Sequence, residues 1–313
     1  MKKIDAVCFG LAVTDLLITG FNSEVVFSGD LTRMEGMELS VGGDALNEAS
    51  VLASLGYGVS LMSRLGDDLF ARHVVETIEK RGVQNGMAIQ PGQHTGLSIV
   101  LIRPDGQRHF AVRKWDETLA VTHAEDLDME LIEQAKVVSY GSLFTSGDLD
   151  SEKLVPILRK AQQAGTITCA DIMMELGASL EQVEKALPYL DYMLPSLEEA
   201  AYYTGQETPS QMAQVLLEKG VGTVIIKMGG EGVFVKNTEL EVTLPAFAVP
   251  VVDTTGAGDN FVAGFISGLI DDLPLLECVR RGNGCGAISV QQVGASAAVK
   301  SKQQLLDFLA AHA

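Results

Sequence analysis

Short apolar and β-branched runs alternate with longer amphipathic patterns over most of the chain. The short runs predict strands, and the longer patterns, with apolar residues three and four positions apart, predict helices. Two of these helices end at Gly56 and Gly82, which is typical of a helix C-terminus. Strands are expected at 4–11, 59–63, 137–140, 166–170, 192–194 and 223–227, and helices at 45–55 and 69–80.

This alternation predicts an α/β fold, in which a mainly parallel central sheet carries helices on both faces. The sequence contains no internal repeat, low-complexity tract or linker, so we expect one domain over 1–313. Ligands of such sheets bind at the carboxyl ends of the strands, where polar residues are therefore of most interest.

Two stretches, 16–39 and 95–113, alternate like strands but have no helix between them. In the second, Pro104-Asp105-Gly106 is a turn signal between strand-like segments at 97–102 and 109–112, so this stretch predicts a hairpin. We expect a small antiparallel lid, with a hairpin of no functional role as the equal alternative. Edge strands of this kind also form dimer contacts, so a homodimer through the lid strands is a further expectation.

The charge balance limits the partners of the protein. The chain has 23 Lys and Arg against 41 Asp and Glu, a formal net charge of −18. Nucleic acids and anionic membranes both require concentrated basic residues, so neither is an expected partner. The four cysteines and five histidines have no metal-ligand spacing, and no secretory signal follows Lys2 and Lys3. We expect free buried thiols and a cytoplasmic protein.

The segment at 251–261, with the sequence VVDTTGAGDNF, is the most informative part of the chain. It predicts a strand end, a turn of small residues and then an apolar helix from Asp259 through Leu269. Gly256, Ala257 and Gly258 allow several backbone N–H groups to converge at the helix N-terminus, where the helix dipole also favours an anion. The pattern therefore predicts a site for a phosphoryl group.

Asp259 lies inside this predicted anion site. A carboxylate there would repel phosphate unless it removes a proton from the attacking hydroxyl. The alternative is that Asp259 only caps the helix, which Asp does well. From the turn alone the two interpretations remain equal.

The sequence DTTGAGD at 253–259, followed by Asn260 and Phe261, resembles the C-terminal signature of the ribokinase-like carbohydrate kinases, also called the phosphofructokinase-B type. The sequence VGGDALNEA at 41–49, followed by RLGDD at 64–68, resembles the N-terminal signature. The resemblance runs from about residue 4 to the C-terminus. It implies a ribokinase-like fold and ATP-dependent, Mg²⁺-assisted phosphorylation of a hydroxyl on a small neutral sugar.

The resemblance also implies roles for individual residues. Asp259 would be the catalytic base, and the backbone of Gly256, Ala257 and Gly258 would stabilise charge on the transferring phosphoryl group. The residues implied to bind sugar hydroxyls are Asp15, Gly42, Gly43, Asn47 and Ser142, the last at the position of a sugar-binding Glu. Asp15 follows an apolar strand, so it is alternatively a residue that only caps the strand end.

On the nucleotide side, Ser196 and Glu199 resemble the family's Asn-x-x-Glu segment, in which Glu199 would hold Mg²⁺ through water. Ser196 departs from the usual Asn, and the pair is equally a helix capping box. The implied ATP-binding residues are Lys227, Gly229 and Gly232 in a Gly-rich turn, with Asn283 beside the adenine. A plain hairpin turn and a core helix contact are the respective alternatives. Asp253 and Thr255, with carbonyls at 294–298, match loops that hold a monovalent cation such as K⁺ in several relatives.

Departures from the family limit the choice of substrate. Asp44 replaces a Lys of ribose-specific members, Ser142 a Glu and Val13 an Asn, so ribose is not expected. Sugar acids are not favoured either, because the Asn and Arg that accompany them are missing after Asp171. Arg113 and Lys114 would suit a substrate phosphate or carboxylate, or are simply solvated.

Other functions remain as alternatives: a nucleoside kinase, a sugar-phosphate kinase, or a non-catalytic sugar- or nucleotide-binding protein on the same fold. Asp259 and the glycines beside it are all present, which favours the enzyme.

Overall fold

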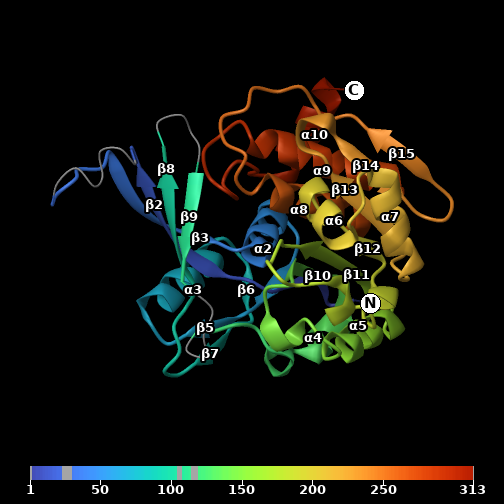
Figure 1. Ribbon diagram of the computed structural model, residues 1–313, viewed down its shortest axis with the longest axis horizontal. Helices are drawn as coiled ribbons and strands as arrows, with labels where there is room; N and C mark the ends of the chain where they lie inside the picture. The colour runs from blue at the N-terminus through green and yellow to red at the C-terminus, as the bar shows by residue number, and fades with distance from the viewer. Residues whose placement is uncertain (1, 23–29, 104–107, 114–118, 313) are drawn as a thin grey trace.

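The computed structural model describes residues 2–22, 30–103, 108–113 and 119–312. Within these residues the centre of the molecule is a nine-stranded sheet (Figure 1). Seven strands of this sheet, β1, β4, β6 and β10 to β13, run parallel to one another. At one edge, β14 and β15 are added in antiparallel pairing. In spatial order the strands are β15 (Glu241–Leu244), β14 (Val233–Lys236), β13 (Thr223–Lys227), β12 (Tyr192–Met193), β11 (Ile167–Ile172), β10 (Ala135–Leu143), β1 (Ile4–Phe9), β4 (Val59–Met62) and β6 (Gln84–Asn85).

Helices cover both faces of the central sheet, as the sequence pattern predicts. One apolar core joins the sheet to α2 (Asp44–Ser54), α3 (Leu69–Lys80), α8 (Ala257–Ile270), α9 (Leu275–Ser289) and α10 (Lys302–Ala311). The other core joins the opposite face to α4 (Met129–Gln134), α5 (Leu154–Gln163), α6 (Leu197–Thr204) and α7 (Pro209–Glu218). The four cysteines are free and buried, as expected.

A second, four-stranded sheet stands beside the central one, and we call it the lid sheet (Figure 1). Its order is β3 (Gly36–Gly42), β2 (Val13–Thr19), β8 (Leu97–Ile102) and β9 (Arg108–Val112). The expected hairpin is confirmed as the antiparallel pair β8–β9, whereas its turn at 104–107 lies outside the described residues. A short parallel pair, β5 (Arg64–Gly66) and β7 (Ala88–Gln90), lies below the lid sheet.

Some boundaries differ from those expected, for local reasons. The first strand ends at Phe9 rather than residue 11, because Gly10 turns the chain with φ +135°. The helix of the anion-site motif begins at Ala257, two residues before Asp259. Among the described helices, none combines the length and the apolar character needed to cross a bilayer.

The connectivity determines where a ligand can bind. The strand after β1 in the chain joins the lid sheet, whereas β4 and β10 flank β1 on its two sides. The chain continues from β1 towards β4 on one side and from the neighbouring β10 towards β11 on the other, and such a reversal creates a crevice beyond the carboxyl ends of the strands. The lid sheet and the start of α8 border this crevice.

Candidate active site

A cavity of about 1080 Å³ opens at this crevice. Segments that follow β1, β10 and β11 line its sheet side, and β8 and β9 line its lid side. The predicted site residues that line it are Asp15, Gly42, Gly43, Asn47, Asp253, Thr255, Gly256, Ala257, Gly258 and Asp259. The structure therefore brings the two sequence signatures together around one cavity.

The anion-site motif forms the N-terminus of α8. Gly256 is the N-cap residue with φ +69°, a left-handed conformation that favours glycine. A Cβ at this position would also lie 2.3 Å from the carbonyl oxygen of Ala295. Asn260 joins these two segments, since its side-chain amide donates to the carbonyls of Gly256 and Ala295 at 2.7 and 2.6 Å. The turn is thus a rigid backbone surface at the positive end of a helix dipole.

Asp259 is not the N-cap residue of α8, so the capping alternative is not what the structure has. Its Oδ2 accepts a hydrogen bond from the Asn47 side-chain amide at 2.7 Å, across 212 residues of sequence. Burial raises the pKa of Asp259, while the bond from Asn47 and the charge of Lys227 act in the opposite direction. A carboxylate held this way, at the edge of a cavity, is arranged to accept a proton.

Lys227, expected in the nucleotide turn, lies directly behind the anion site. Its Nζ donates to both carboxylate oxygens of Asp171, at 2.6 and 2.7 Å. It also lies 3.3 Å from where a Cβ on Gly258 would be, so the ammonium group borders the turn. Burial lowers the pKa of Lys227, but the carboxylates of Asp171 and Glu199 outweigh burial and raise it. The lysine therefore places a positive charge next to the turn at Gly258.

Two carboxyl groups that the sequence interpretation did not assign lie on α2, near Asp259. Burial raises the pKa of Asp44 well above its usual range, and the charges of Asp259 and Asp171 raise it further. Burial and the charge of Asp171 raise the pKa of Glu48 in the same way. Both groups consequently hold their protons to a higher pH than ordinary carboxyls do.

Asp15 lies on the lid side of the cavity. A Cβ on Gly42 would lie 2.2 Å from its Oδ2, so the glycine makes room for the carboxylate. Burial raises the pKa of Asp15, and the Ser98 hydroxyl and the Arg108 guanidinium act against this. The carboxylate oxygens of Asp15 are therefore placed to accept hydrogen bonds from ligand hydroxyls.

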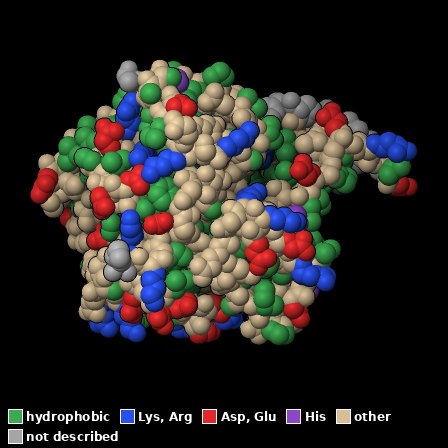
Figure 2. Space-filling model, turned by 180° about the vertical axis from the view of Figure 1, so that it is seen from behind, with side chains coloured by type: hydrophobic (Ala, Val, Ile, Leu, Met, Phe, Trp, Pro, Cys, Tyr) green, Lys and Arg blue, Asp and Glu red, His purple; other side chains and the backbone are tan. Residues whose placement is uncertain are grey.

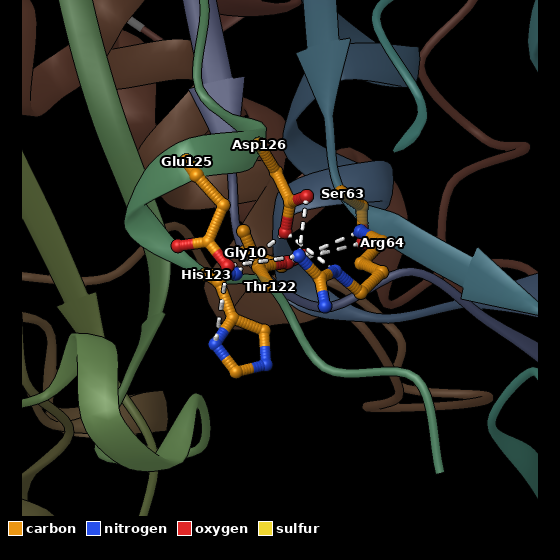
Figure 3. A network of polar contacts seen from close by, with 7 residues as sticks. All are labelled: Gly10, Ser63, Arg64, Thr122, His123, Glu125 and Asp126. Carbon is orange, nitrogen blue, oxygen red and sulfur yellow. Dashed lines mark hydrogen bonds and ion pairs between the residues drawn. The ribbon is translucent and has the colours of Figure 1, made fainter. Parts of the chain in front are cut away.

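A polar network includes Thr122, the last residue of the segment at 119–122 that lines the cavity (Figure 3). Arg64 forms two hydrogen bonds of 2.8 Å with the Asp126 carboxylate, which also accepts from the His123 backbone N–H at 2.7 Å. The Thr122 hydroxyl donates to the carbonyl of Gly10 at 3.1 Å. The guanidinium of Arg64 is thus engaged by a carboxylate, although the residue borders the cavity.

Asp253 connects three segments. Its Oδ1 accepts from the Thr255 backbone N–H at 3.0 Å, and its Oδ2 accepts from the Gly294 N–H at 2.8 Å. Oδ2 also forms an ion pair with Arg108 of β9. Asp253, predicted as a cation ligand, is therefore engaged by three nitrogen donors, one of which is itself positively charged.

Other predicted residues lie away from the cavity lining. Ser142 is fully buried, and its hydroxyl accepts from the Leu11 backbone N–H at 3.2 Å. Ser196 and Glu199 form the reciprocal capping box of α6, the alternative interpretation of that motif. The turn carrying Gly229 and Gly232 joins the antiparallel strands β13 and β14, as in the hairpin alternative, and Asn283 donates to the Pro245 carbonyl at 3.3 Å.

Charged side chains of both signs are interspersed over the face seen in Figure 2, from which the lid sheet projects. Arg113 borders the cavity, whereas Lys114 lies outside the described residues. The described residues contain no group of three or more His, Cys, Asp or Glu side chains arranged to hold a metal ion.

Comparison with known proteins gives consistent matches. The sequence profile of the pfkB family carbohydrate kinases matches residues 3–302. Probable fructokinase-2 of Arabidopsis thaliana is 28% identical over 294 residues, 89% of each chain. The 2-dehydro-3-deoxygluconokinase of Bacillus subtilis (strain 168) is 27% identical, over 99% of this chain and 96% of its own.

A solved structure confirms the fold. The ribokinase of Arabidopsis thaliana, complexed with ribose and ATP, superimposes with a TM-score of 0.81 at 23% identity, over 98% of both chains. The expected ribokinase-like architecture, with a mainly parallel sheet and a small antiparallel one, is thereby confirmed. With the family profile matching almost the whole chain, the protein belongs to the pfkB family of carbohydrate kinases and is a phosphotransferase that uses an alcohol group as acceptor.

Proposed function

We propose that the protein transfers the γ-phosphoryl group of ATP to a hydroxyl of a small neutral sugar, with Asp259 as the base. The observation that carries this proposal is the buried Asp259 carboxylate, held by Asn47 at 2.7 Å beside the N-terminus of α8. A base and an anion-binding turn then meet within one turn of backbone, as phosphoryl transfer to a hydroxyl requires.

In the proposed reaction, Asp259 takes the proton of the sugar hydroxyl as the oxygen attacks the γ-phosphorus. The new O–P bond forms while the bond from the γ-phosphorus to the bridging oxygen breaks, and ADP leaves. Backbone N–H groups at Gly256, Ala257 and Gly258 stabilise the charge on the transferring group. Lys227 lies next to Gly258 and adds a positive charge behind that turn. Asp15, Gly42, Gly43 and Asn47 hold the sugar.

Mg²⁺ fits the chemistry of this site. It is a hard cation that prefers oxygen ligands and usually retains several waters beside the nucleotide phosphates. Glu199, whose pKa burial raises, would hold it through water, and the ion would neutralise charge on the nucleotide. Ser196, Gly229, Gly232 and Asn283 remain the predicted nucleotide contacts, and Ser142 a predicted sugar contact.

A monovalent cation at Asp253 and Thr255 remains a prediction. The engagement of Asp253 by Arg108, Thr255 and Gly294 does not fit a cation held by that carboxylate, so we derive no step through one. Comparing turnover in potassium and in tetramethylammonium salts tests this point. A homodimer through the lid strands also remains a prediction, which light scattering after gel filtration tests.

The charges around the cavity support a neutral substrate. Asp15, Asp44 and Asp259 offer acceptors for hydroxyl groups, whereas two of the lining arginines, Arg64 and Arg108, are paired with Asp126 and Asp253. The fructokinase relatives make fructose the first sugar to test. Arg113 also lines the cavity, so a sugar phosphate or sugar acid is the second candidate. A nucleoside is the third.

A coupled ADP-release screen over hexoses, pentoses, nucleosides, sugar acids and sugar phosphates tests the proposal. We expect turnover with a neutral sugar, and fructose is the first compound to compare. Activity confined to sugar phosphates or sugar acids would contradict the neutral-sugar assignment and point to Arg113. The Arg113→Gln variant separates these outcomes, because it should raise the KM of an anionic substrate much more than that of a neutral one.

A further inference from the structure

The ion pair between Arg108 and Asp253 joins the lid sheet to the anion-binding turn. Arg108 is the first residue of β9 and pairs with Ile102 at the end of the β8–β9 ladder that lies away from the central sheet. Its side chain crosses to the loop before α8 and is 11% exposed, while that of Asp253 is 6% exposed. A charge pair this well shielded from water is screened little by salt and is costly to break on one side only.

Asp253 also forms hydrogen bonds with the turn and with the loop that packs against it. Oδ1 of Asp253 accepts from Thr255, one residue before the N-cap Gly256. Oδ2 accepts from Gly294, one residue before Ala295, whose carbonyl packs against Gly256 and accepts from Asn260. The single carboxylate therefore links the lid, the anion-binding turn and the loop that supports this turn.

In the lid sheet, Arg108 belongs to an edge strand, β9. Among the strands that the structure describes, β9 is outermost in the lid sheet and is hydrogen-bonded only to β8. Phe110 and Val112 of the same strand are 51% and 65% exposed, although both border the cavity. The Arg108–Asp253 ion pair thus connects β9 to a segment outside its own sheet.

We infer that Arg108 is a positioning residue that makes a productive anion-binding turn conditional on a closed lid. With the lid closed, the guanidinium holds Asp253, and Asp253 holds the backbone N–H groups of the turn in the orientation needed for phosphoryl transfer. With the lid open, the Asp253 carboxylate loses Arg108, which is one of its three donors and the only charged one among them. The turn that Asp253 holds is then less firmly fixed. Transfer then occurs chiefly when the lid covers the sugar, which limits transfer to water.

This inference rests on the proposed function, and a double-mutant cycle tests it. The variants are Arg108→Gln, Asp253→Asn and the double substitution, assayed with the sugar that the wild-type enzyme phosphorylates. We expect each single substitution to lower kcat/KM for the sugar by about tenfold, a usual scale for coupled neighbours, and the double substitution to be no worse than either one. Arg108→Lys should recover part of the loss, because it restores the charge but not the fork of donors.

Two further readouts separate positioning from a general loss of structure. The fraction of ATP hydrolysed without sugar transfer should rise in Arg108→Gln. Amide hydrogen exchange should become faster both in β8–β9 and at 254–256. Arg159→Gln is the matched control, because it removes the same charge from an exposed residue of α5, a helix outside the lid sheet. We expect it to leave both readouts unchanged.

The outcomes distinguish the inference from the proposed function. If the wild-type enzyme phosphorylates no sugar, the proposed function fails before the cycle is run. If it is active and the two single losses multiply in the double variant, Arg108 and Asp253 act independently and the inference is wrong. A large rise in the KM for ATP in Arg108→Gln, with kcat unchanged, would equally overturn it, because the arginine would then bind the nucleotide directly.

Discussion

Lys227 and Asp171 form a buried, two-bonded ion pair, with Nζ 2.6 and 2.7 Å from the two carboxylate oxygens. The lysine ends β13, the aspartate lies one residue before the end of β11, and the carboxyl ends of these parallel strands meet at the floor of the site. Its positive member, Lys227, lies in a region that also holds the carboxyl groups of Asp44, Glu48, Glu199 and Asp259. The charge state of the base therefore depends on this pair.

The pH dependence of kcat/KM tests that dependence. The base is active when unprotonated, and burial raises the pKa of Asp259, so activity should fall with decreasing pH earlier than for an ordinary Asp. The charge of Lys227 lowers this pKa, whereas the carboxylates of Glu199 and Asp171 have the same sign as the base and act in the opposite direction. Lys227→Met should raise the pKa and move the acid limb of the profile to higher pH.

Asp171→Asn provides the matched comparison. It removes a negative charge and leaves Lys227 without its carboxylate partner, so the pKa of Asp259 should fall and the acid limb should move to lower pH. Displacement of the limb in the same direction by both substitutions would contradict this electrostatic account. Asp171→Asn should also lower stability, because it leaves a buried ammonium group without its countercharge.

Gly256→Ala tests the rigidity of the anion-binding turn. The substitution places a Cβ at φ +69° and 2.3 Å from the Ala295 carbonyl oxygen, so the turn and its supporting loop must separate. We expect a loss of about 1–3 kcal/mol in the free energy of unfolding and a kcat lower by at least about tenfold. Urea unfolding and steady-state assays measure the two effects.

Gly58→Ala is the control for this substitution. Gly58 is exposed, has no positive φ and would place its Cβ 3.6 Å from Asp5, an ordinary contact. Its stability and kcat should stay close to those of the wild type. Equal effects of the two substitutions would mean that the turn tolerates a side chain and that its geometry is not restricted as described.

The sequence pattern was sufficient for much of the fold and for part of the site. The strands at 223–227 and 97–102 and the helix at 69–80 match the expected boundaries, because each has a clear period and a capping or turn residue at its end. The turn of small residues before α8 was also predictable as a structure, since its glycines, its helix and Asp259 lie within one continuous segment.

The ion pairs of the site were not predictable in the same way. Lys227 and Asp171 are 56 residues apart, and Arg108 and Asp253 are 145 apart, with no local spacing that relates them. Such pairs depend on which strands become neighbours and how far the lid reaches. The one available signal was positional, because Asp171 and Lys227 both lie at the carboxyl ends of predicted parallel strands.

Shortening the β8–β9 hairpin tests whether the lid sheet covers the substrate. Replacing the turn at 104–107 by a shorter linker should raise the KM for the sugar and the share of ATP hydrolysed without transfer, because water enters the cavity. An ADP-release assay, run with and without sugar, measures both quantities. Unchanged kinetics would show that the hairpin has no role in the reaction.

The most direct test of the account is the kcat of Asp259→Asn with sugar and ATP both saturating. The substitution preserves size and leaves an oxygen that can accept from Asn47, but it removes the base, so folding and ATP binding should survive. We expect kcat to fall by at least about a hundredfold, the usual scale for the loss of a general base. Asp253→Asn should have a milder effect, of about tenfold. A folded Asp259→Asn enzyme with a kcat close to that of the wild type would contradict the proposed mechanism.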